Sequence, residues 1–136
     1  MRVFLDANNL FSAAKSDGAV RALLHLLADR GHTCWVADCV VIEARRNLAA
    51  KGGAPLLTLD ALLGRLRLAP GVASTEGIEG MDWLPEKDRP VLAAAIRLRC
   101  DVLVTGDRAH FGPGYGQSFH GVAVHSPRSL AERLLG

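Results

Sequence analysis

Short apolar runs alternate along this chain with longer segments in which apolar residues recur at helical spacing, and this alternation constrains the fold most. The runs occupy residues 3–5, 34–37, 102–104 and 122–124. Each run is too short for a helix and ends at a polar or turn residue, which is typical of a buried strand. Apolar side chains at positions i, i+3, i+4 and i+7 predict amphipathic helices over 20–27 and 59–66.

Two further helices complete the pattern. Val91, Ala95 and Leu98 form a third apolar stripe, and Ser126 followed by Pro127 is a strong helix start. Strands that alternate with helices predict an α/β fold, with a mainly parallel sheet covered on both faces. No repeat or boundary divides the chain, so a single domain over residues 1–136 is expected. Residues 70–85 show no clear period, and residues 112–116 predict a loop.

The composition fits one folded domain. Of 136 residues, 49% are hydrophobic and 22% are charged, which allows a core and argues against disorder. With 16 basic and 14 acidic residues, the chain lacks the strongly basic balance of duplex-DNA-binding domains. Its three cysteines lack the close pairing of zinc or redox sites. Neither a signal-peptide pattern nor a membrane-length apolar run is found, so a cytoplasmic protein without membrane association is expected.

Four acidic residues belong to segments that should meet at one edge of such a sheet. Asp6 follows the first strand, and Asp107 closely follows the run at 102–104. Glu43 falls in the first two turns of the helix after the second strand, and Asp88 begins the helix of the third stripe. Open α/β sheets carry their functional crevices at the carboxyl ends of their strands. We therefore predict that these four residues form one pocket that is both catalytic and metal-binding.

Packing four carboxylates together calls for a cation. Two unit charges ~4 Å apart repel by ~4 kcal/mol at an effective dielectric of ~20, so they cannot all stay ionised unless a cation intervenes or some are protonated. Oxygen ligands without His or Cys among them favour Mg²⁺ or Mn²⁺ over zinc. A water bound to such an ion has a lowered pKa and is a suitable nucleophile for a phosphodiester.

The polar residues of this pocket also have purely structural interpretations. Asp88, close to Pro90, could instead cap its helix, and Glu43 could be a solvated helix residue. Asn8 and Thr105 are either supporting donors to the acids or ordinary turn residues.

Five motifs resemble those of PIN-domain proteins, and the resemblance runs nearly from end to end. They stand at residues 4–10 (FLDANNL), 41–44 (VIEA), 87–95 (KDRPVLAAA), 101–107 (DVLVTGD) and 121–127 (GVAVHSP). The first four carry the family's acidic positions, in order, onto Asp6, Glu43, Asp88 and Asp107. The fifth is similar to the tail of bacterial PIN proteins that are toxin components. Ala7 stands where the family often has Thr or Ser, which removes one hydroxyl.

The resemblance implies a three-layer α/β/α sandwich and an endoribonuclease that hydrolyses RNA phosphodiester bonds with Mg²⁺ or Mn²⁺. It also implies a toxin that is held silent by a small antitoxin encoded nearby, and a homodimer. Asn8 and Thr105 carry over as supporting positions. The alternative function is a catalytically silent PIN module that binds RNA or a protein partner.

Two other α/β families with acidic pockets fit less well. A phosphatase of the haloacid dehalogenase type has a second Asp two residues after the first, where Asn8 stands here. A signalling receiver has a Lys late in the chain, and no Lys follows Lys87.

The predicted loop after Asp107 has more aromatic residues than loops usually have. We expect Phe111 and Phe119 to fold inward, and Tyr115, which is flanked by glycines, to be exposed. Single-stranded RNA is commonly held by bases stacked on aromatic rings. Tyr115 and His110 are therefore candidate substrate-binding residues.

Overall fold

The computed structural model describes residues 1–50, 54–70 and 73–136. Its strands are β1 (Arg2–Leu5), β2 (Thr33–Ala37), β3 (Arg67–Ala69), β4 (Val102–Val104), β5 (Ser118–Phe119) and β6 (Val122–His125). Its helices are α1 (Ala7–Lys15), α2 (Ala19–Asp29), α3 (Asp38–Ala49), α4 (Ala54–Leu63), α5 (Arg89–Arg97), α6 (Arg108–Phe111) and α7 (Pro127–Leu135). Two short 3₁₀ turns, η1 (Glu86–Asp88) and η2 (Gly112–Gly114), complete the described elements.

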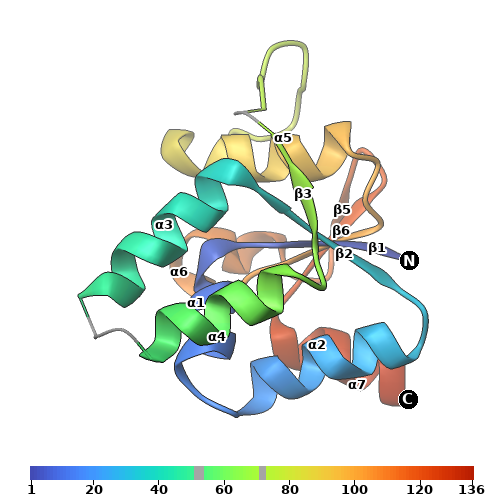
Figure 1. Cartoon of the computed structure of the whole chain (residues 1–136). Helices are drawn as coiled ribbons and strands as arrows, with labels where there is room; N and C mark the ends of the chain where they lie inside the picture. Colours follow the sequence, from blue (N-terminus) through green and yellow to red (C-terminus); the bar gives the residue numbers. More distant parts are fainter. Residues whose placement is uncertain (51–53, 71–72) are drawn as a thin grey trace.

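The strands form one six-stranded sheet in the order β3-β2-β1-β4-β6-β5. All neighbouring pairs are parallel except β5 with β6, so a short antiparallel strand closes one edge. In Figure 1, α5 lies on one side of the sheet, whereas α2, α4 and α7 lie on the other. This is the three-layer α/β/α fold with a mainly parallel sheet that the sequence predicts.

The register of the central strands fixes the position of the polar residues that follow them. Leu5 is paired with Val104 across β1 and β4, so Asp6 and Thr105 leave the sheet side by side. The Asp6 N–H donates to the Val104 carbonyl at 3.2 Å, and the Thr105 N–H donates to the His125 carbonyl at 3.0 Å. Two polar residues from distant parts of the sequence are thereby held together by backbone hydrogen bonds.

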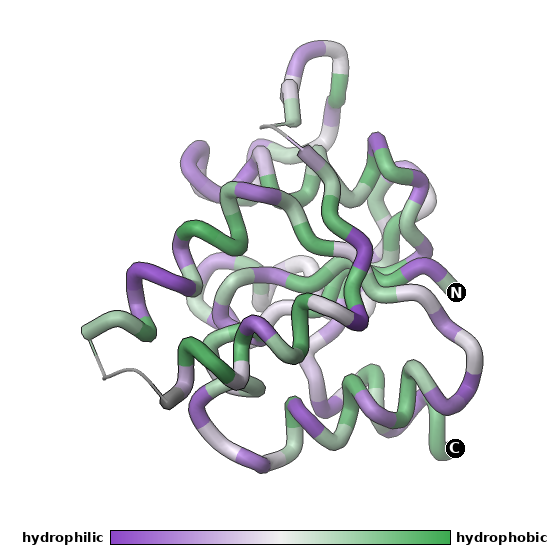
Figure 2. The backbone as a smooth tube through the Cα atoms, in the orientation of Figure 1, coloured by the Kyte–Doolittle hydropathy of each residue, from purple (hydrophilic) through white to green (hydrophobic). Residues whose placement is uncertain are grey.

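The core lies between the sheet and its helices, where the strands are coloured as hydrophobic in Figure 2. The stripe of α2 buries Leu23, Leu24 and Leu27, as the helical spacing predicts. The stripe predicted over 59–66 is confirmed for its first part, because Leu59 and Leu62 are buried in α4. Its last residue, Leu66, lies beyond the end of α4 at Leu63.

The last helix begins as the sequence predicts. The Ser126 hydroxyl accepts a hydrogen bond from the Ser129 N–H, and the Ser129 hydroxyl accepts one from the Ser126 N–H, both at 3.1 Å. Pro127 occupies the first helical position. None of the helices in the described ranges is long and apolar enough to cross a membrane.

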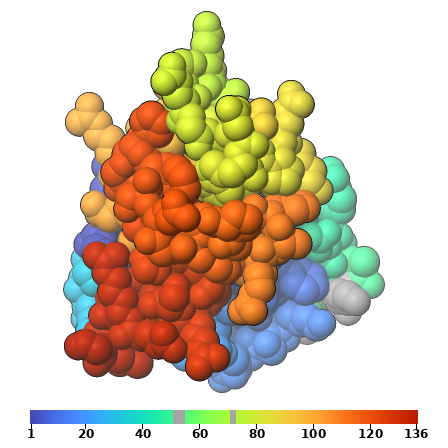
Figure 3. All heavy atoms as spheres, turned by 180° about the vertical axis from the view of Figure 1, so that it is seen from behind, coloured from blue at the N-terminus to red at the C-terminus, as the bar shows by residue number. Residues whose placement is uncertain are grey.

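Residues 73–85, which belong to the stretch of 70–85 without a clear period in the sequence, are held in place by side chains from other parts of the chain. Arg89 Nε donates to the Met81 and Leu84 carbonyls at 3.1 and 2.9 Å, and Arg97 binds two carbonyls earlier in the segment. Trp83 stacks on Phe119, with ring centroids 4.8 Å apart. Figure 3 shows this segment resting on the residues around β5. These contacts fix the path of the chain into Asp88.

Candidate metal centre

Asp6 is a buried carboxylate at the carboxyl end of β1. It is only 7% exposed and forms the N-cap of α1, where its Oδ1 accepts the Ala7 N–H at 2.8 Å. The pKa of the Asp6 carboxyl is raised to about 6, chiefly by burial and to a smaller extent by the charges of Glu43 and Asp88. The hydrogen bonds from Ala7 and Thr105 oppose that rise. Nearby negative charge and burial both make a cation favourable at this carboxylate.

Thr105 and Asn8 hold Asp6 in place. The Thr105 hydroxyl, which is fully buried, donates to Asp6 Oδ2 at 2.9 Å and accepts the Asp107 N–H at 3.1 Å. Asn8 Nδ2 lies 3.4 Å from Asp6 Oδ2, and Asn8 Oδ1 accepts the Gly106 N–H at 2.9 Å. Both residues therefore contact the acids or the backbone beside them, as the supporting interpretation of the sequence requires.

Asp107 caps the short helix α6 with one carboxylate oxygen. Its Oδ1 accepts the His110 N–H at 3.2 Å, while its Oδ2 lies 3.0 Å from His110 Nδ1. In the first turn of a helix, the side chain three residues after the N-cap lies back over the cap. This local geometry brings the His110 ring to the acid.

Asp88 precedes α5 but makes no capping hydrogen bond with its side chain. The capping interpretation of Asp88 is therefore wrong for this carboxylate. Its Oδ2 instead lies 2.8 Å from His110 Nδ1. Although that distance suits an ion pair, neither atom has a directed hydrogen bond, and both are shielded from solvent.

All four predicted acids line one cleft of about 640 Å³. Glu43 reaches it from α3 and is exposed, whereas Asp6 is buried and Asp88 and Asp107 are partly buried. Two cationic side chains, Arg46 and Lys87, also line this cleft. The acids that the sequence predicts to converge are thus brought together, with positive charge beside them.

The residues of the cleft fit a divalent cation. The carboxylates of the cleft, together with the imidazole of the neighbouring His110, are a donor set that suits Mn²⁺ and, through its oxygens, Mg²⁺. The donor atoms of Asp88, Asp107 and His110 all lie within 4.8 Å of one another. The shielded oxygen of Asp88 lacks a directed hydrogen bond, and a cation would satisfy it. The expectation of an all-oxygen set omitted His110, which the sequence analysis assigned to substrate binding.

The comparison with protein families settles the family. The model of the PIN domain matches residues 2–109, which include all four acids.

The chain belongs to the PIN-domain family.

The PIN fold is also found by comparison with solved structures. The chain is similar to the crystal structure of VapBC2 from Rickettsia felis bound to a DNA fragment from their promoter. The TM-score is 0.68 over 93% of this chain and 98% of that chain, at 18% identity, which supports the fold alone. No curated protein sequence matches this PIN-domain chain.

Tyr115 does not line the acidic cleft of this PIN domain. The expectation that Tyr115 is exposed is wrong, because its hydroxyl turns inward and donates to the Thr105 carbonyl at 2.8 Å, which leaves the ring partly buried. The ring borders a separate hollow beside Arg108 and Pro127. Phe111 is fully buried, as expected, and Phe119 is partly buried. Tyr115 therefore supports the backbone at Thr105, and its role in RNA stacking stays a prediction.

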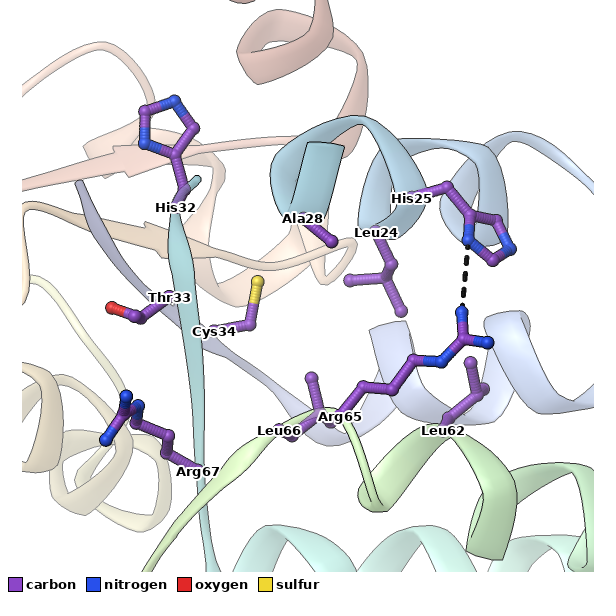
Figure 4. A pocket seen from close by; sticks show the side chains of 10 residues that line it. All are labelled: Leu24, His25, Ala28, His32, Thr33, Cys34, Leu62, Arg65, Leu66 and Arg67. Atoms are coloured by element: carbon purple, nitrogen blue, oxygen red, sulfur yellow. Dashed lines mark hydrogen bonds between the residues drawn. The ribbon is translucent and has the colours of Figure 1, made fainter. Parts of the chain in front are cut away.

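A second hollow of the PIN domain, of about 200 Å³, lies at the amino ends of β2 and β3 (Figure 4). Apolar side chains and Cys34 face it, and Arg65 approaches His25 at 3.5 Å on its rim. Burial raises the pKa of the Cys34 thiol to about 11, so it stays protonated and unreactive near neutral pH. Because its lining has no carboxylate, this hollow cannot do the chemistry expected of the acidic cleft.

Proposed function

We propose that this PIN domain is a divalent-metal-dependent endoribonuclease and the toxin of a toxin–antitoxin pair. The observation that carries the proposal is the convergence of Asp6, Glu43, Asp88 and Asp107 on one cleft. PIN domains are generally nucleases, and the chain has an acid at each position that the family resemblance singles out.

The four acids would have different roles in hydrolysis. Asp6, Asp88 and Asp107 would hold the cation, and Thr105 and Asn8 would keep the Asp6 carboxylate oriented toward it. A bound Mg²⁺ or Mn²⁺ would lower the pKa of water and offset charge on the scissile phosphate. Glu43 is the most exposed of the four acids and would take the proton of the attacking water on a carboxylate oxygen.

Arg46 and Lys87 support an RNA substrate. Both line the cleft beside the acids, where each could neutralise a backbone phosphate that would otherwise be repelled. The overall charge is only +2, so attraction to a polyanion depends on such local cations. Single-stranded or loop RNA fits an open cleft of this kind better than a rigid duplex does.

The proposed partners are a small antitoxin encoded nearby and a second copy of the chain, in the cytoplasm. The family resemblance supports both, and the fold likeness to a chain of VapBC2 is consistent with an antitoxin. A short open reading frame next to this gene would supply the candidate antitoxin. Co-expression of the two products should restore growth that the chain alone arrests.

Cleavage of a labelled single-stranded RNA tests the enzyme. The purified protein should cut it in Mg²⁺ or Mn²⁺ and stop in EDTA, and Asp88→Asn should abolish cutting with an unchanged circular dichroism spectrum. Asp29→Asn, an exposed acid at the end of α2, is the matched control and should cut normally. RNA binding without cutting by the unaltered protein would establish the silent alternative instead.

A further inference from the structure

His110 is a neighbour of the acidic cleft that the PIN-domain match does not cover, because that match ends at residue 109. Its backbone N–H is bound to Asp107 Oδ1, which fixes the first turn of α6. Its ring is partly buried, at 33% exposure of the side chain, and lies between two acids from different elements. The fold thus holds an imidazole where the family resemblance supplies only carboxylates.

The contacts of His110 Nδ1 have a spacing that suits neighbouring ligands of one ion. Nδ1 lies 2.8 Å from Asp88 Oδ2 and 3.0 Å from Asp107 Oδ2. Two neighbouring ligands of an octahedral ion, each bound at about 2.0–2.2 Å, lie roughly 3 Å apart. In contrast, Nδ1 and Asp88 Oδ2 have no directed hydrogen bond although both are shielded from water. A group that only paired with the acids would point its N–H at one of them.

We propose that His110 is a nitrogen ligand of the metal centre, bound through Nδ1, and that it makes the centre prefer Mn²⁺ to Mg²⁺. This inference rests on the metal-dependent function proposed above. Carboxylates serve both ions, but an imidazole binds first-row transition ions far better than Mg²⁺, which keeps oxygen ligands and water. Coordination through Nδ1 requires the neutral ring with its proton on Nε2.

Pulsed electron paramagnetic resonance of Mn²⁺ bound to the whole chain tests the assignment directly. A coordinated imidazole gives a ¹⁴N coupling to the ion, and labelling of histidine with ¹⁵N must change it. The coupling should be present in the unaltered protein and absent in His110→Asn, whose side chain offers an oxygen in a similar place. His25→Asn, at an exposed position on α2, is the matched control and should keep the coupling.

Calorimetric titration with Mn²⁺ and Mg²⁺ gives the second readout. His110→Asn should weaken Mn²⁺ binding by roughly 10- to 100-fold and Mg²⁺ binding much less, so that the preference for Mn²⁺ falls by a similar factor.

The outcomes separate this inference from the proposed function. Binding of neither ion by the unaltered protein would end both. Binding of Mn²⁺ without a ¹⁴N coupling would overturn the nitrogen ligand alone and leave His110 as a counter-ion of the acids. That result would not depend on whether His110→Asn folds.

Discussion

The hydroxyl of Thr105 donates a hydrogen bond to Asp6 Oδ2 across 2.9 Å, although 99 positions separate the two residues in the sequence. The Thr105 hydroxyl oxygen also accepts the Asp107 N–H, so one side chain sets the positions of two candidate ligands. Thr105→Val keeps the shape and removes the hydroxyl, which leaves a buried donor and acceptor without their partner. We expect a loss of about 1–3 kcal/mol in the free energy of unfolding, measured in urea, and slower RNA cleavage.

Thr75→Val is the control for that substitution, because Thr75 is exposed. It should change neither stability nor cleavage. If Thr105→Val were as stable and as active as the unaltered protein, the hydroxyl would not position the acids.

Stability without metal should depend on pH through Asp6. The pKa of this carboxyl is about 6 in the folded protein and ordinarily 3.8, so the folded state binds its proton more tightly. Stability therefore falls as pH rises from about 4 to 6, and above that range the full penalty of about 3 kcal/mol applies. Asp6→Asn removes the penalty. In EDTA, Asp6→Asn should increase the free energy of unfolding by about 3 kcal/mol more at pH 8 than at pH 4. An equal effect of the substitution at both pH values would refute the buried-acid explanation.

Divalent ions should raise the melting temperature at neutral pH. An ion bound only by the folded state stabilises it, by about 2.7 kcal/mol when the free ion exceeds the dissociation constant 100-fold. Asp107→Asn should reduce this response in differential scanning calorimetry, whereas Asp29→Asn should retain it. An identical response in the Asp107 variant would remove Asp107 from the ligand set.

Arg46 should contribute to RNA affinity through charge. Arg46→Ala should weaken binding of single-stranded RNA and reduce the slope of log affinity against log salt by about 0.7, the contribution of one phosphate contact. The measurement is made in Ca²⁺, an ion for oxygen ligands that should support binding with little cutting. Arg133→Ala, on α7, is the charge-matched control. An unchanged slope for Arg46→Ala would show that this residue meets no phosphate.

A side chain at Gly114 should destabilise the protein. A Cβ at this position would lie 2.6 Å from Cη2 of Trp83, whose ring is held by the stack on Phe119. Gly114→Ala should cost about 1–3 kcal/mol of unfolding free energy, because the ring must move. At Gly64 a Cβ would meet only the Ala61 carbonyl oxygen at 3.5 Å, so Gly64→Ala should have a much smaller effect. Equal losses of stability at the two positions would mean that the Trp83 ring can move aside without a cost in free energy.

The parts of the fold that follow from local patterns could be predicted from the sequence. The central strands are short apolar runs because both of their faces are buried. The apolar residues of α2 repeat at helical spacing because one face of the helix is buried. The edge strands β3 and β5 were not predicted. Arg67 and Leu68 in β3 are exposed, and β5 has only two residues, so neither strand shows a buried run. β3 pairs with β2, about thirty residues earlier in the chain, whereas β5 pairs with the adjacent β6 through only two residues.

The same distinction applies to the candidate site. Asp6 and Asp107 could be predicted because strand ends in a parallel sheet share an edge. The contact of His110 with Asp88 could not be predicted, because it depends on how the first turn of α6 faces a residue of another element. The spacing of three residues from Asp107 was visible, and with the cap geometry of a helix start it would have suggested an imidazole at the acid. Residues 73–85 escaped prediction because arginine side chains, rather than a periodic apolar face, hold them.

The long separation of Asp6 and Thr105 in the sequence has a consequence for folding during translation. Domains fold as they emerge from the ribosome, and contacts between distant residues form late. A nascent chain that stops before Thr105 has a first acid with neither its hydroxyl partner nor the neighbouring strand that supplies Asp107. A translation product that ends before Thr105 therefore lacks the complete candidate metal centre, and the proposed ribonuclease activity should begin only after both segments have left the ribosome.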